Sequence, residues 1–365
     1  MTSSPDLLAG LADIHPDSAL AQARATREAA TRHAQGSYEA LFSQPEGDFP
    51  LTARYALAAQ VAEWHGEAGL QAHYAQRAQP VAASAHHEQA LAFARRLTFE
   101  PVAATAAHIQ ALRDAGWHED GVVTLAQLVA FISFQSRLLA GLRLLQGEPL
   151  SGHGAVAAGR WHDAPTTASG KAAPTAFTQQ ELGWEPWLAA KPLAAFSAEE
   201  QATLARFGHS DSDYFRLLGR NLPLLEQRTL TDKGIFYTPG GLPRAERELA
   251  ATVVSKVNGC IYCASVHARK AAQLSKEQAA VQRLLDVAPG VSLSAGQDAR
   301  WAAIIDFAAA LSATPARANQ SQLQALRDHG LDTLALLDVV QSTAFFAWAN
   351  RLMLTLGEPF LPAQA

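Results

Sequence analysis

Residues 323–340 read LQALRDHGLDTLALLDVV, and this stretch decides the fold class. Its apolar side chains recur every three or four residues, the spacing that places them on one face of a helix; they are Leu323, Leu326, Leu331, Leu334, Leu337 and Val340. Gly330 interrupts the pattern, which predicts that one helix ends there and the next begins. Ala, Leu, Arg, Gln and Glu fill much of the remaining chain in the same way, and alternating strand patterns are hard to find. The sequence therefore predicts an all-α fold.

Length and composition bound the class of protein. The 365 residues are enough for two domains of about 150 to 180 residues each. A chain that is 48% hydrophobic and 17% charged is typical of a globular protein. The formal charge of −5 provides no broad positive field for phosphates, so nucleic acid is not expected as a partner. No basic and apolar leader opens the chain and no uninterrupted apolar run of roughly 20 residues is present, so we expect a cytoplasmic protein without a membrane partner.

Two parts of the chain repeat each other. Residues 93–114 read FARRLTFEPVAATAAHIQALRD, and residues 307–328 read FAAALSATPARANQSQLQALRD, with their matches at a constant offset. Both copies finish in Gly-Glu-Pro, at residues 147–149 and 357–359. Ordered matches that end in the same tripeptide indicate a tandem duplication of one helical domain.

A change of composition separates the two copies. From residue 151 the chain runs through Ala, Thr, Ser, Gly and Pro with almost no bulky apolar residue, which is typical of a linker. We place the first domain at residues 1–150, the linker at 151–176 and the second domain at 177–365. Residues 177–196 carry Trp184 and Trp187 around Pro186. This segment is too apolar to stay solvated, so we expect it to strap onto a domain surface.

The two cysteines of the chain are Cys260 and Cys263, a spacing that lets a dithiol close reversibly. The segment after Pro243 has helical spacing and ends at Asn258-Gly259, so a new helix is expected to start near Cys260. Free N–H groups in a first helical turn favour thiolate over thiol. Cys260, Cys263 and His267 then share about 60° of the helix circumference. A carboxylate from Glu248, on the preceding helix, could hold the imidazole in one tautomer and raise its basicity.

Other interpretations of these residues stay open at this point. The cysteines could be buried structural thiols, although His267 and Glu248 at these spacings make that interpretation the weaker one. Two thiolates and an imidazole could also bind zinc, but a structural zinc site usually brings a second Cys or His pair, and none is nearby in the sequence. Glu248 alone could be a solvated helix carboxylate.

The motif resembles the signature of a known family. Glu248, eleven residues, Cys260, two residues, Cys263, three residues and His267 together look like the alkylhydroperoxidase D family, within the wider carboxymuconolactone decarboxylase superfamily. The Asn-Gly-Cys-x-Tyr-Cys context is similar to its peroxidase-related branch. The resemblance is strongest over about residues 197–359 and extends weakly, without the motif, to residues 1–150.

This resemblance implies an all-helical fold that oligomerises, with Cys263 as the peroxide-attacking thiolate and Cys260 as the resolving thiol and proton donor. Glu248 and His267 would form the proton relay. It implies no prosthetic cofactor and no metal, and it implies a protein or small-thiol reductant, which in the family can be a dihydrolipoyl protein. Tyr262 stands where the best-known member has a histidine between the cysteines, which implies a shorter relay.

The first copy lacks this chemistry. When Arg54 is aligned with Arg247, Tyr55 stands in place of Glu248 and Tyr74 near the position of His267. The cysteine positions hold Glu67 and Leu70. We therefore expect the first domain to be a degenerate copy that completes a pseudo-twofold pair with the second.

The leading hypothesis is an antioxidant thiol peroxidase that reduces hydrogen peroxide or organic hydroperoxides through a Cys260–Cys263 disulfide. The alternative is a general dithiol oxidoreductase or redox sensor that reacts only slowly with peroxide. A carboxymuconolactone decarboxylase-type lyase would use acid and base groups without needing paired thiols. An oligomeric scaffold without catalysis is the fourth class.

Overall fold

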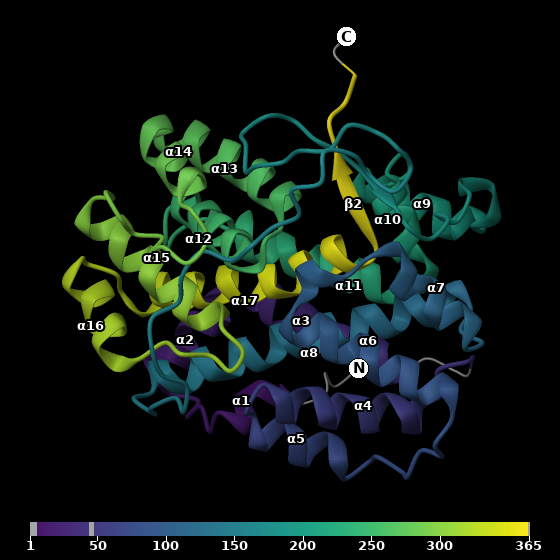
Figure 1. Cartoon of the computed structure of the whole chain (residues 1–365). Coiled ribbons are helices and arrows are strands. Elements are labelled where there is room, and N and C mark those ends of the chain that lie inside the picture. The colour runs from purple at the N-terminus through teal and green to yellow at the C-terminus, as the bar shows by residue number, and fades with distance from the viewer. Residues whose placement is uncertain (1–5, 44–46, 364–365) are drawn as a thin grey trace.

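The computed structural model describes residues 6–43 and 47–363, and helices dominate it, as predicted (Figure 1). The helices of the first copy are α1 (Leu7–Leu11), α2 (Ala19–Thr26), α3 (Glu28–Ser43), α4 (Leu51–Trp64), α5 (Ala68–Ala75), α6 (Ala85–Phe99), the 3₁₀ helix η1 (Pro101–Ala103), α7 (Ala106–Asp114) and α8 (Glu119–Leu145).

The second copy contains more elements. These are η2 (Leu193–Ala195), α9 (Ala198–Phe207), α10 (Asp213–Leu218), η3 (Gly219–Asn221), α11 (Leu222–Phe236), α12 (Arg244–Asn258), α13 (Ile261–Ser275), α14 (Gln278–Asp286), α15 (Ala299–Ser312), α16 (Gln320–Asp328) and α17 (Thr333–Thr355). The predicted break at Gly330 lies between α16 and α17, and Gly330 has a positive φ of 81°. Within the described residues the sheet structure is two short strands, β1 (Gly183–Pro186) and β2 (Gly357–Phe360).

The order of helices repeats as the duplication predicts. Helices α6, α7 and α8 begin at the same constant offset from α15, α16 and α17 that relates the two sequence copies. Helices α3, α4 and α5 precede them in the same order as α11, α12 and α13, and α14 is inserted only in the second copy. Equivalent helices pack against each other, α8 against α17 and α3 against α11.

Two reciprocal contacts confirm that the copies form a pseudo-twofold pair. The Nη2 of Arg137 in α8 donates to the carbonyl oxygen of Ser312 at 2.8 Å. The Nη2 of Arg351 in α17 donates to the carbonyl oxygen of Thr98 at 2.9 Å. Arg137 and Arg351 are equivalent positions of the two copies, and so are Thr98 and Ser312. The arginine of each copy therefore donates to the same carbonyl position of the other copy. Such reciprocity is the signature of a twofold interface.

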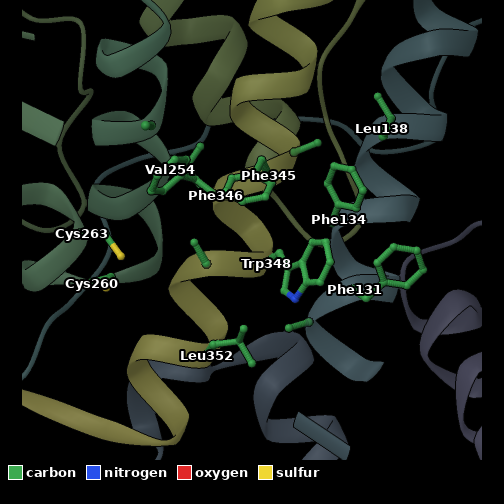
Figure 2. Close-up of a cluster of buried hydrophobic side chains, with 14 of the residues drawn as sticks. Phe131, Phe134, Leu138, Val254, Cys260, Cys263, Phe345, Phe346, Trp348 and Leu352 are labelled. Atoms are coloured by element: carbon green, nitrogen blue, oxygen red, sulfur yellow. The ribbon is translucent and has the colours of Figure 1, made fainter. Parts of the chain in front are cut away.

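The core lies where α8 meets α17. Nearly every residue of both helices is buried, which explains why neither shows a polar face. Figure 2 shows Phe345 and Trp348 of α17 facing Phe131 and Phe134 of α8. By length and composition α8 could cross a membrane, but its apolar window is buried entirely inside the protein, as in the core helix of a globular fold.

The segment predicted as a linker is packed against the second copy. Residues 151–176, all described by the structure, contain no helix and only an isolated bridge between Thr166 and Ala172. The N–H of Gly159 donates to the carbonyl oxygen of Lys256 at 3.1 Å, which binds the segment to the end of α12. The boundaries at residues 150 and 176 stay predictions.

Residues 177–196, which were predicted to pack on a domain surface, do so. They are held there by a pair of strands that the sequence did not indicate. Strand β1 pairs antiparallel with β2, from Gly183 opposite Phe360 to Pro186 opposite Gly357. The indole Nε1 of Trp184 donates to the carbonyl oxygen of Met353 at 3.0 Å. Each strand has only four residues, and two of the four in β1 are Gly or Pro. Strands this short do not show the alternation of apolar and polar residues by which a strand is predicted.

Candidate functional site

The two cysteines lie at the start of α13, as predicted. Helix α12 ends at Asn258 and is capped by Gly259, whose φ of +76° is left-handed and suits glycine. A side chain there would also meet the carbonyl oxygen of Arg160 at 2.1 Å, because the backbone of residues 151–176 crosses at this point. Cys260 is the N-cap of α13 and Cys263 is in its first turn. The turn at Gly259 thus sets both thiols at a helix N-terminus.

The two thiols are reduced, buried and electrostatically different. Burial raises the pKa of Cys260 well above its ordinary value. A hydrogen bond from Cys260 lowers the pKa of Cys263 despite its burial, and the positive charges of His267 and Arg228 lower it further. The pair therefore has one thiol suited to be a thiolate and one suited to donate a proton.

Glu248 and His267 meet as the sequence predicted. The imidazole Nδ1 lies 2.6 Å from Glu248 Oε2, and Arg244 Nε donates to Glu248 Oε1 at 3.0 Å. An ionised carboxylate can only accept, so the proton of this bond sits on Nδ1 and the lone pair of the neutral ring is left on Nε2. His267 is one helical turn beyond Cys263, on the same face of α13.

The charges of this pair reinforce each other. Burial alone would raise the pKa of Glu248, but hydrogen bonds from His267 and Arg244 more than offset it, so the pKa is lowered. Burial would likewise lower the pKa of His267, but the bond and charge of Glu248 outweigh burial and raise it. Glu248 is therefore an anion that favours the imidazolium form of His267, and the interpretation of Glu248 as a solvated surface carboxylate is wrong, since it is 2% exposed.

The structure adds residues that sequence spacing did not indicate. Arg228 of α11 is 6% exposed, and its guanidinium lies 5.1 Å from the ring centre of Phe345 and 5.7 Å from that of Trp348. Asn350 of α17 is one of the groups that lower the pKa of the Cys263 thiol. Phe346 packs edge-on against His267, with ring centres 4.2 Å apart. These residues come from helices that are distant in the sequence from the cysteine motif.

Two cavities adjoin the site from different sides. A groove of about 840 Å³ is lined by polar and basic side chains, among them Arg244, Glu248, His267, Arg269 and Lys270. A second cavity of about 220 Å³ is mostly apolar and reaches Cys260 and Tyr262. Tyr262 therefore lines a cavity with Cys260, and Glu248 lies beside His267 without an intervening side chain. Trp187, predicted only as part of the strap, also lines the apolar cavity.

No metal centre is formed in the part of the chain that the structure describes. Across residues 6–43 and 47–363, no group of three or more His, Cys, Asp or Glu side chains is placed to hold a metal ion.

The first copy has the same helices and the same buried arginine as this site, but other residues stand at the positions of the two cysteines, the glutamate and the histidine. Arg54 donates to the carbonyl oxygens of Phe49 and Leu41, and Arg247 makes the equivalent bonds to Leu242 and Ile235. At the other positions, Glu67 is the N-cap of α5 and pairs with Arg143 at 3.0 Å, and Leu70, Tyr55 and Tyr74 join the apolar core. The predicted loss of the dithiol from the first copy is thus visible in the helices.

Comparison with known proteins finds a family match over the segment that carries the motif. Residues 223–302 match the model of the carboxymuconolactone decarboxylase family. Over these residues the chain is similar to that family. The match spans α11 through the start of α15 and includes all four residues of the predicted motif. The resemblance inferred from the motif spacing is confirmed for this family segment.

Two solved structures are similar to the chain. An uncharacterized peroxidase-related protein from Silicibacter sp. TM1040 is 24% identical with a TM-score of 0.39, and the match covers 47% of this chain and 92% of that one. The alkylhydroperoxidase AhpD core, an uncharacterized peroxidase-related protein from Ralstonia eutropha JMP134, is 22% identical with a TM-score of 0.37, covering 45% and 86%. None of the curated proteins compared with the chain matches it.

The different environments of the thiols predict a two-step titration. In the reduced protein, ultraviolet thiolate absorbance should develop first for Cys263, at a pH below the usual thiol range, and for Cys260 well above it. Cys263→Ser should remove the low step, and Glu248→Gln should move it to higher pH, because His267 then carries less positive charge. A low step that survives Cys263→Ser would assign the thiolate to Cys260 instead.

Proposed function

We propose that the family segment carries a thiol-dependent peroxidase, which reduces hydrogen peroxide or an organic hydroperoxide and serves antioxidant defence. The observation that supports this most is the line of groups from Glu248 through His267 to the thiol of lowered pKa, Cys263. A reactive thiolate, a neighbouring acid–base group and a second thiol are the three parts that a dithiol peroxidase needs.

The oxidation steps follow from these parts. The Cys263 thiolate attacks one peroxide oxygen, so an S–O bond forms while the O–O bond breaks, and the leaving oxygen takes a proton from the His267 imidazolium. Cys263 is then a sulfenic acid, oxidised by two electrons. The thiol of Cys260 attacks that sulfur, an S–S bond forms, and the hydroxyl leaves with the Cys260 proton as water. Glu248 holds His267 in place and stabilises its charged form.

The cycle closes when a thiol reductant opens the disulfide by transferring two electrons. The chain supplies no cofactor in this scheme. A small thiol or a dihydrolipoyl protein as reductant, assembly into a homo-oligomer and a cytoplasmic location stay predictions.

Mass spectrometry of the peroxide-treated protein tests the roles of the two cysteines. Wild type should gain an intramolecular disulfide, and Cys260→Ser should accumulate sulfenic or overoxidised Cys263, because no resolving thiol remains. Cys263→Ser should show no such adduct on Cys260. If the adduct appears on Cys260 of Cys263→Ser at the wild-type rate, the roles are wrong. A wild-type protein that forms the disulfide with a disulfide oxidant but not with peroxide would instead be a dithiol oxidoreductase.

A further inference from the structure

The groove of about 840 Å³ beside His267 carries more positive than negative charge. Among the described residues that line it, one side chain is a carboxylate, Glu248, and the cationic side chains are Arg244, Arg269 and Lys270. The whole chain has a formal charge of −5, so this groove is a positive region on an acidic protein. A concave surface lined by charge of one sign raises the local concentration of ions of the other sign.

Two of these three cations have no counter-ion in the part of the chain that the structure describes. Arg244 is neutralised by Glu248, whose Oε1 lies 3.0 Å from its Nε. Arg269 Nη1 donates to two backbone carbonyl oxygens, at 2.6 and 3.3 Å. Lys270 Nζ donates to the amide oxygen of Gln273 at 3.2 Å. Because these acceptors are uncharged, the charges of Arg269 and Lys270 remain available to an anion.

The groove reaches the dithiol site at His267, whose side chain lines it and is 20% exposed. Lys270 follows Cys263 by seven residues, close to two helical turns, so both lie on one face of α13 about 10 Å apart along the helix axis. His267 lies between them on that face. An anion held by Lys270 would therefore lie next to the imidazole, where its charge favours the imidazolium form.

The groove also has space and apolar surface for the carbon part of a ligand. Its volume is typical of sites that bind small molecules. Val266 lines it beside His267, and the ring of Tyr237 is 63% exposed. The guanidinium carbon of Arg244 lies 4.0 Å from the centre of that ring. An exposed aromatic ring in the wall suits an organic molecule better than a bare inorganic ion.

We infer that this groove binds a small organic acid, whose carboxylate pairs with Lys270 and Arg269 and lies against His267. Binding requires only the charge and shape of the groove, and neither cysteine sulfur has to face it. The effect of the acid on the dithiol, through the charge of His267, rests on the proposed peroxidase cycle. The acid can be a group on the hydroperoxide itself or a separate molecule, since both present the same carboxylate.

Hexanoate and hexanamide test the requirement for charge, because they have nearly the same size and differ in charge. Saturation-transfer NMR measures their binding to the reduced full-length protein. Wild type should bind hexanoate severalfold more tightly than hexanamide, and Lys270→Gln should remove most of that difference. Lys276→Gln is the matched control and should bind as wild type, since Lys276 is the exposed C-cap of the same helix and does not line the groove.

The contact with His267 has a readout of its own. Heteronuclear NMR of protein labelled with ¹³C-histidine follows the imidazole signal, which is assigned by its loss in His267→Gln. Saturating hexanoate should raise the pKa of His267 in wild type and in Lys276→Gln, and should raise it less in Lys270→Gln.

Stopped-flow rates of the reduced protein distinguish the two sources of the acid. Linoleic acid hydroperoxide and its methyl ester, below micelle-forming concentrations, differ in the acid group alone. A faster reaction of the acid that is lost in Lys270→Gln and kept in Lys276→Gln assigns the carboxylate to the substrate. Equal rates for acid and ester, with hexanoate changing the rate of hydrogen peroxide, assign it to a separate ligand. If neither rate responds, the groove is not coupled to the dithiol and the effect through His267 is wrong.

Three outcomes would overturn the binding site: equal affinity for hexanoate and hexanamide, displacement of hexanoate by an equal concentration of sulfate, or a His267 pKa that hexanoate does not move. Equal weakening by Lys270→Gln and Lys276→Gln would also contradict it, because the overall charge of the protein would then attract the acid. A protein that binds hexanoate as expected but is inert to peroxide would contradict the proposed function and leave the binding site intact.

Discussion

Glu248→Gln should lower the second-order rate with peroxide by about 100-fold, the scale of general acid–base catalysis. The amide keeps the size of the side chain but removes the charge that raises the pKa of His267. The imidazolium that donates to the leaving oxygen then becomes scarcer near neutral pH, and Cys263 loses a neighbouring positive charge. Stopped-flow tryptophan fluorescence of the reduced protein during peroxide addition measures the rate across about pH 6 to 8.

Glu246→Gln is the control for this variant. Glu246 is also a buried carboxylate of α12, but it pairs with Arg300 at 2.7 Å instead of His267. Its substitution removes a similar charge two residues away and should leave the peroxide rate near that of wild type. A Glu248→Gln protein that keeps the full rate over the whole pH range would remove Glu248 from the mechanism.

Asp338→Asn should destabilise the protein by about 3 to 5 kcal/mol, because it leaves two buried arginines without their counter-ion. Arg27 Nε lies 2.7 Å from Asp338 Oδ1, and Arg247 Nη2 lies 3.2 Å from Asp338 Oδ2. All three side chains are at most 2% exposed, and Arg27 belongs to the first copy. The free energy of unfolding from urea denaturation, followed by circular dichroism, measures the loss.

A second ion pair between the copies provides the comparison. Arg220 Nη1 lies 2.7 Å from Asp120 Oδ1, but the carboxylate is 71% exposed. Asp120→Asn should therefore cost no more than about 1 kcal/mol. If both variants lose the same free energy of unfolding, burial is not what makes the Asp338 ion pairs stabilising.

Much of the fold could be predicted because its signals are local. Helical spacing and the Gly330 break indicated the helices, and the constant offset between copies indicated the duplication and the pseudo-twofold pair. The β1–β2 pairing was missed because it joins short strands that lie far apart in the sequence. The close packing of residues 151–176 was missed because that composition is equally typical of free linkers.

The site was predictable to the extent that its residues lie on two consecutive helices. Spacing on α13 placed Cys260, Cys263 and His267 on one face, and the motif added Glu248 on α12. Arg228 of α11 and Asn350 of α17 lower the pKa of Cys263, and no spacing in the sequence indicates that these helices pack beside the cysteines. The cavity beside Cys260 needed three separate chain segments to meet, so its walls could only be found in the structure.

The Asp338 cluster shows what fusing two copies into one polypeptide permits. In a dimer of identical subunits every substitution occurs in both subunits. An acidic residue near the twofold axis would therefore be accompanied by the same acidic residue of the other subunit. Here the position equivalent to Asp338 is Thr124, and the acid exists once. When two copies are fused in one chain, each side of the interface between them can therefore change independently. One copy carries the two cysteines and the other does not, an asymmetry that a homodimer of identical chains cannot have.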